Sequence, residues 1–140
     1  MRLNRNSRAI QRVPHASLRL PALPVQANPR KQIEKTEKFL AEFDQIPLIY
    51  AGPDGEILFG EEIWLALKET GAIEVDAIII NDKSPAELKA ISLALHRLPA
   101  DARWIDQNVK LVLEELESVD FDLDLTGFDA PEIDNAVGSR

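Results

Sequence analysis

The spacing of hydrophobic residues predicts a mixture of helices and strands. Apolar side chains repeat at helical spacing over four segments: 29–43, 60–70, 85–98 and 106–118. Short apolar or alternating runs predict four strands: 18–20, 47–50, 56–59 and 75–80. The run at 75–80 ends in consecutive aliphatic residues, which is typical of a buried interior strand. The predicted order from Pro47 to Ile80 is hairpin, helix and strand.

Turn and cap residues support these boundaries. Gly52-Pro53-Asp54-Gly55 predicts a tight turn, which makes the two flanking strands a hairpin. Asn28 is expected to cap a helix whose first residue is Pro29. Ser84-Pro85-Ala86-Glu87 has the spacing of a capping box, and Gly71 follows a predicted helix where a left-handed residue is favoured.

The predicted folded part extends from residue 17 to residue 134. Residues 1–16 are expected to form a basic, flexible arm, and residues 135–140 a tail. Six residues are expected to share one core: Leu48, Ile49, Ile57, Ala66, Ile78 and Ile80.

An acidic stretch near the C-terminus allows two interpretations. In Asp120–Leu125 acidic and apolar residues alternate, which predicts an extended segment with one face on the core. The same alternation occurs in calcium-binding loops. However, Leu125 occupies the required glycine position and Pro131 the position of the final glutamate. We therefore expect no metal site.

The net charge of −8 is divided unevenly along the chain. Residues 1–31 contain seven basic side chains and no acid, so the remaining 109 residues, with 9 basic and 24 acidic groups, carry −15. Four arginines fall on one stripe of a possible helix before Pro14: Arg2, Arg5, Arg8 and Arg12. Three interpretations stay open: an arm that contacts nucleic acid, a targeting peptide, or a solvated segment that offsets the acidic part.

Residue types limit the possible chemistry. The chain has no cysteine, which excludes thiolate metal sites and cysteine nucleophiles and favours a reducing compartment such as the cytoplasm. No apolar run reaches the ~20 residues of a membrane span. His96 is expected to be a structural histidine, and Trp64 and Trp104 are expected to fill the core. No catalytic residue is assigned.

The turn Phe59-Gly60-Glu61 offers the most specific functional signal. It carries a predicted strand into a helix N-terminus, where free N–H groups favour anions. Glu61 and Glu62 begin that helix, and their charge opposes a phosphate.

The order of elements and several motifs resemble the ParB/sulfiredoxin-like superfamily. More narrowly, the chain is similar to the ParB-like domain associated with phage-type DNA modification methylases. The segments that carry the resemblance are 28–30, 54–57 with Gly60, Ala66, Gly71, 75–79, Trp104 and 120–129. The resemblance covers roughly residues 17–134.

The resemblance implies an α+β fold, in which a small mixed sheet forms a partly open barrel with surrounding helices. Members of the superfamily bind nucleotide phosphates at the glycine-to-helix turn, and ParB proteins bind and hydrolyse CTP and load onto DNA. CTP or ATP is therefore the ligand that the resemblance implies. The absence of cysteine excludes sulfiredoxin chemistry.

The chain departs from the family pattern at this turn. Ile63 occupies the position where the family has a phosphate-binding arginine, and two glutamates precede it. Arg30 remains as a cation that could meet an anion. The expected remnant of the phosphate pocket comprises Gly60, Glu61, Glu62, Ile63 and Arg30.

These observations predict a non-catalytic accessory or regulatory module of a DNA-associated or phage-derived system, with a degraded nucleotide pocket. Its expected partners are DNA, through the basic arm, and a methylase or another protein, but not a membrane. One alternative is a ParB-type nucleotide hydrolase or nuclease. Another is a protein-interaction domain that uses the acidic C-terminal surface.

Overall fold

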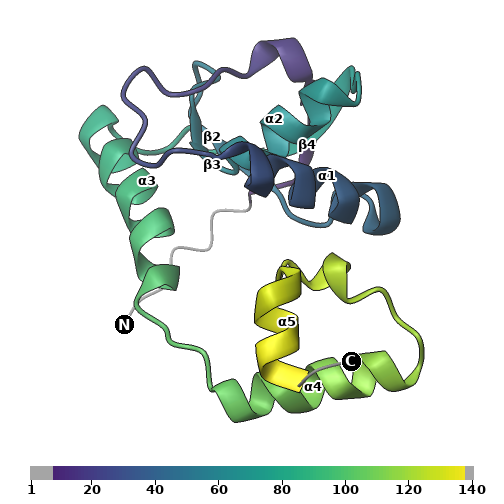
Figure 1. Ribbon diagram of the computed structural model, residues 1–140. Helices are drawn as coiled ribbons and strands as arrows, with labels where there is room; N and C mark the ends of the chain where they lie inside the picture. The colour runs from purple at the N-terminus through teal and green to yellow at the C-terminus, as the bar shows by residue number, and fades with distance from the viewer. Residues whose placement is uncertain (1–7, 138–140) are drawn as a thin grey trace.

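The fold consists of a sheet with packed helices and a separate helical unit at the C-terminal end (Figure 1). The computed structural model describes residues 8–137. Its elements are β1 (Gln11–Pro14), η1 (His15–Ser17), α1 (Arg30–Phe43), β2 (Ile49–Ala51), β3 (Ile57–Phe59), α2 (Glu61–Glu69), β4 (Glu74–Ile79), α3 (Pro85–Ala100), α4 (Asp106–Ser118), η2 (Leu123–Thr126) and α5 (Ala130–Val137). In Figure 1, α3 runs along one side from the sheet towards the C-terminal unit.

The sheet is mixed and open, with strand order β1-β4-β2-β3. β4 pairs parallel with β2 and antiparallel with β1, while β2 and β3 form an antiparallel hairpin. Val75 and Ala77 of β4 are buried, in agreement with the interior position expected for this strand. The α+β fold class with a mixed sheet is confirmed.

The β2–β3 turn requires a glycine at its last position. Gly55 has a φ of +90°, and a Cβ there would lie 2.2 Å from the backbone oxygen of Ser17. This close approach brings the Leu18–Leu20 segment beside β3. The expected strand is reduced there to one bridge, between Arg19 and Glu56.

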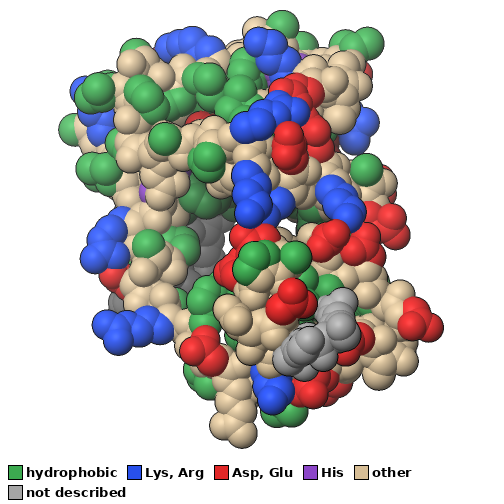
Figure 2. All heavy atoms as spheres, in the orientation of Figure 1, with side chains coloured by type: hydrophobic (Ala, Val, Ile, Leu, Met, Phe, Trp, Pro, Cys, Tyr) green, Lys and Arg blue, Asp and Glu red, His purple; other side chains and the backbone are tan. Residues whose placement is uncertain are grey.

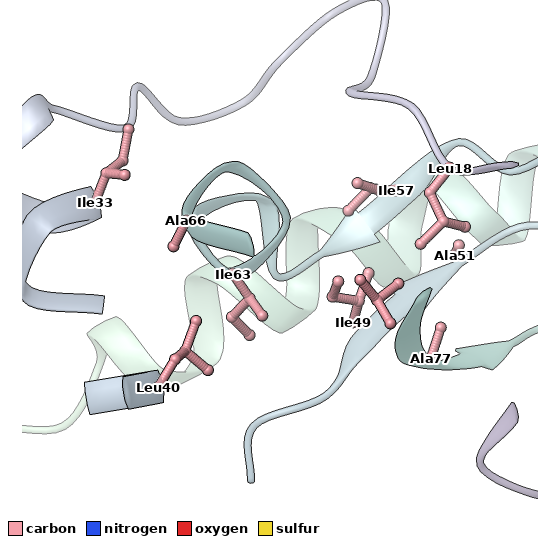
Figure 3. Packing of buried hydrophobic residues seen from close by; sticks show 10 residues of the cluster. Leu18, Ile33, Leu40, Ile49, Ala51, Ile57, Ile63, Ala66 and Ala77 are labelled. Atoms are coloured by element: carbon pink, nitrogen blue, oxygen red, sulfur yellow. The ribbon is translucent and has the colours of Figure 1, made fainter. Parts of the chain in front are cut away.

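The main core lies between the sheet, α1 and α2. Ile63 of α2 lies between Leu40 of α1 and Ile49 of β2 (Figure 3). Of the six residues expected in the core, four are buried, namely Ile49, Ile57, Ala66 and Ile80. The other two, Leu48 and Ile78, are half-buried.

The C-terminal unit has a core of its own, formed by Leu113, Leu123 and Ile133. Ion pairs connect this unit to α1. Lys31 contacts Asp129 at 2.9 Å. Lys38 contacts Asp122 at 3.1 Å and Asp124 at 3.2 Å.

Four expectations about the elements are corrected. Ordered structure begins before Ser17, because β1 pairs with β4 from the distant centre of the chain. Residues 120–125 are not extended; the Asp122 side chain accepts a hydrogen bond from the Asp124 N–H and starts the 3-10 turn η2. The α5 helix continues into the expected tail, and α3 continues through Pro99.

The core predicts a clear contrast between two isoleucines. Ile57 is 1% exposed and Ile73 is 81% exposed. We expect Ile57→Ala to lower the free energy of unfolding by about 2–5 kcal/mol, because it leaves a cavity. Ile73→Ala should change it by less than about 0.5 kcal/mol. Urea denaturation measures both, and equal effects would contradict this account of the core.

Candidate functional site

The candidate site begins at Gly60, between the end of β3 and the start of α2. Gly60 has a φ of +99°, and a Cβ there would lie 3.1 Å from the Ile49 Cα and 3.2 Å from the Leu48 oxygen. Both the dihedral angle and the close approach to β2 require glycine. No side chain caps the N-terminus of α2.

Glu61, the first residue of α2, points inward and contacts α3. Its Oε2 lies 3.1 Å from the Nε2 of His96, and both side chains are buried. The His96 Nδ1 lies 2.7 Å from the backbone oxygen of Ser92. A carbonyl oxygen only accepts, so Nδ1 carries a proton, and a further proton must lie between Nε2 and Oε2.

Burial raises the pKa of the Glu61 carboxyl above its ordinary value, and the facing His96 opposes that shift. The other oxygen of Glu61, Oε1, is buried without a hydrogen-bond partner. The Glu61–His96 pair therefore joins the start of α2 to α3 through one shared proton.

Ile63 lies in the main core and is 2% exposed. The position where the family has arginine thus points away from solvent. Glu62 is half-buried and lines a groove of about 550 Å³ between α1, the start of α2 and η2.

This groove combines an apolar floor with charged edges. Phe39, Ile63 and Leu125 contribute apolar surface, and Lys31 and Lys35 of α1 contribute ammonium groups. Lys31 already contacts Asp129. An anion in the groove would meet the lysines on one side and Glu62 on the other.

Arg30 does not lie beside Gly60. Its guanidinium forms ion pairs with Glu34, Glu37 and Glu69. Glu69 is the last residue of α2, whereas Gly60 precedes the first. The bond from Arg30 holds the pKa of Glu69 below its ordinary value. The Arg30 guanidinium is therefore engaged at the C-terminal end of α2, whereas the other four residues of the expected pocket remnant lie at its N-terminal end.

Of the four arginines that fall on one stripe of a possible helix, the two that the structure describes do not lie on a helix. Arg12 belongs to β1 and lies 3.3 Å from Asp76, and Arg8 lies 2.9 Å from Asp82. Arg2 and Arg5 lie outside the described residues.

The two tryptophans differ in environment. Trp64 is half-buried; its ring stacks on His15 at 4.3 Å, and its indole N–H donates to the His15 oxygen. Trp104 is 72% exposed, so the expectation that it fills the core is wrong.

Residues 8–137 contain no group of three His, Cys, Asp or Glu side chains placed to hold a metal ion. None of their helices is long and apolar enough to cross a membrane.

The C-terminal unit is strongly acidic. Residues 109–139 contain one lysine and nine carboxylates, which gives a charge of −8. The same residues match a family described as the ParB-methyltransferase HTH domain.

Solved structures resemble nearly the whole chain. The C-terminally truncated chromosome-partitioning protein ParB from Caulobacter crescentus, in complex with CTP-gamma-S, is similar with a TM-score of 0.73 and 16% identity. The match covers 91% of this chain and 76% of that chain. The fold is that of a ParB-like domain.

A Pnob8-like ParB-N domain is also similar, with a TM-score of 0.55 and 18% identity over 79% of this chain and 44% of that chain. No curated protein sequence matches the chain. The resemblance expected from the sequence is thereby confirmed: the chain is ParB-like, and its end matches a methyltransferase-associated family.

Sequence reasoning missed the partnership of Glu61 with His96. The two residues are 35 positions apart, and nothing in their local sequence indicates contact. It also missed the groove lysines, because helical spacing alone does not show that α1 faces η2.

The shared proton predicts a dependence of stability on pH. Because the folded pKa of Glu61 is raised, its stabilising proton is fully bound below the ordinary glutamate value of about 4.3 and is lost as pH rises through the folded value. We expect the free energy of unfolding to fall with rising pH, by at most about 1.4 kcal/mol per pH unit. Glu61→Gln should remove this fall, because its amide donates to Nε2 at every pH.

Urea denaturation between about pH 5 and pH 9 measures the effect, over the range in which an exposed glutamate is ionised. Glu62→Gln is the matched control, and its free energy of unfolding should depend on pH as steeply as that of the wild type. Equal slopes for the wild type and Glu61→Gln would show that the pair holds no such proton.

Proposed function

We propose that this protein is a non-catalytic ParB-like accessory or regulatory module of a DNA-associated or phage-derived system, and that its nucleotide pocket is degraded. One observation carries the proposal: at the turn before α2, Ile63 is buried in the core while Glu61 and Glu62 begin the helix. The family matched by residues 109–139 supports a methyltransferase as the protein that this module serves.

Electrostatics supports the loss of nucleotide binding. The similar ParB from Caulobacter crescentus was solved with CTP-gamma-S. In the present chain, a phosphate at the start of α2 would gain backbone N–H groups but would face Glu62. Arg30 is bound to three carboxylates elsewhere. No arginine near the turn, among the described residues, is left to form bidentate bonds with phosphate.

This proposal predicts that calorimetric titration of CTP or ATP gives weak or no binding, without hydrolysis. Ile63→Arg is a poor test, because it would place a charge in the core. Glu62→Arg instead places a guanidinium in the groove. Hydrogen bonds to charged groups contribute about 1.5–3 kcal/mol each, so triphosphate affinity should rise at least about tenfold.

Glu74→Arg is the control, since Glu74 is exposed on β4 and the change in net charge is the same. If triphosphate affinity rises more for Glu62→Arg than for Glu74→Arg, the anion binds at the turn. Micromolar binding with turnover by the wild type would overturn the degraded-pocket proposal and favour a ParB-type hydrolase.

For contact with DNA, we propose the arginines near the N-terminus as the residues involved. The segment matched to the HTH family carries −8, which opposes the phosphate backbone. Arg8 and Arg12 have acidic partners, so Arg2 and Arg5 would supply most of the attraction, although they lie outside the described residues.

The expected DNA binding is weak, independent of sequence and steeply dependent on salt. Removal of residues 2–7 should abolish it and leave the melting temperature unchanged, because β1 remains. Removal of residues 2–17 should lower the melting temperature, since it deletes β1 and the His15–Trp64 contact. Fluorescence anisotropy measures the DNA binding, and calorimetry measures the melting temperature. Binding that survives the shorter truncation would show that the contact lies elsewhere.

A further inference from the structure

An apolar surface on the C-terminal unit is partly open to solvent. It consists of Trp104, Ile105, Val109, Val112 and Phe128 and is called the Trp104 surface here. Trp104, Ile105 and Val112 are 72%, 66% and 54% exposed. A cluster of large apolar side chains this exposed is typical of an interaction site.

The Trp104 surface is hollowed. Two hollows, of about 420 Å³ and about 500 Å³, both include Trp104, Val109 and Phe128 in their walls. The Trp104 ring contacts the Phe128 ring at 5.1 Å, and Phe128 packs against the second core. The tryptophan is thus supported from one side and open on the other, an arrangement that is frequent at the centre of protein interfaces.

Charge indicates what kind of partner fits. Figure 2 shows acidic side chains gathered over the lower part of the molecule, where Figure 1 places α4, η2 and α5. Beside the hollows, Arg103 and Lys110 are accompanied by Asp106 and Glu132. Over the whole of residues 109–139 the charge is −8.

This charge disfavours two other occupants. A second copy docked symmetrically through the Trp104 surface would bring two acidic units together, since six of the nine carboxylates of residues 109–139 lie outside the ion pairs with Lys31 and Lys38. The phosphate backbone of DNA would be repelled in the same way. A basic segment with apolar side chains could bury those side chains in the hollows, and its positive charge would be attracted to the acidic unit.

We propose that the Trp104 surface docks a basic, amphipathic segment of a partner protein. The inference rests on the proposed accessory role, for which it names the kind of partner. Apolar side chains of the partner enter the hollows on either side of Trp104, and its lysines or arginines face the acidic side chains of α4 and α5. Nucleotide titration tests the accessory role, whereas peptide binding tests the surface, so the two can fail independently.

The probe is a synthetic amphipathic helical peptide of leucine and lysine, titrated into the full chain and followed by NMR. The indole N–H signals of Trp64 and Trp104 serve as internal reporters. Trp64 donates its indole N–H to His15 beside the sheet, and its signal should stay in place. The Trp104 signal should shift, together with amides of α4 and α5.

Trp104→Ala should weaken peptide binding at least tenfold. Leu23→Ala is the matched control, because Leu23 is 84% exposed outside the Trp104 surface, and it should bind like the wild type. Because Trp104→Ala also removes the contact with Phe128, Val112→Ser provides a second variant, and thermal melts verify that both fold.

A peptide in which glutamate replaces lysine should not bind. Three results would overturn the proposal: unchanged binding by both surface variants, equal binding of the acidic peptide, or concentration-dependent dimerisation that is lost in Trp104→Ala. Tighter peptide binding after removal of residues 2–7 would instead identify the basic start of this chain as the occupant, and would equally overturn it.

Discussion

The structure depends most on the backbone conformation at Gly60. Its positive φ turns the chain from β3 into α2, and the absence of a Cβ allows the close approach to β2, because a Cβ there would lie 3.1 Å from the Ile49 Cα. The direction of α2 follows from this turn, and with it the burial of Ile63 and Ala66 against α1 and the sheet. A larger residue would have to displace backbone atoms of Leu48 and Ile49, so the whole layer of core side chains relies on this one position.

The same turn determines where the acids of α2 point. Glu61 faces α3 and His96, and Glu62 faces the groove beside α1. Burying a carboxylate without a partner is costly, so the position of Glu61 is acceptable only because His96 and a shared proton accompany it. A helix N-terminus that usually favours anions is thus occupied by the protein's own acidic residues. This arrangement supports the proposed loss of triphosphate binding.

Sequence predicted well what depends on neighbouring residues. The turn at Gly55, the capping box at Ser84 and the glycine that precedes α2 are local signals, and the elements around them were predicted within a few residues. β1 was missed because only Val13 is half-buried and its partner is β4, more than sixty positions away. Asp120–Leu125 was misjudged because its alternation fits a strand, whereas an Asp122 side chain bonded to the backbone forms a turn instead. The sequence predicted a candidate site at Gly60 that included Arg30, but it gave no sign of the ion pair between Arg30 and Glu69, which depends on the packing of α1 against α2.

The attachment of the C-terminal unit explains how an acidic, HTH-matching segment can belong to a ParB-like fold. Its core is separate from the main one, and the contacts to α1 are exposed ion pairs of Lys31 and Lys38 together with the stacked rings of Phe43 and Phe121. Exposed ion pairs contribute little and are screened by salt, so this junction is weaker than either core. Lys31 both holds Asp129 and lines the groove. An anion in the groove would therefore compete for Lys31 with the Asp129 carboxylate, which is one of the contacts that join the C-terminal unit to α1.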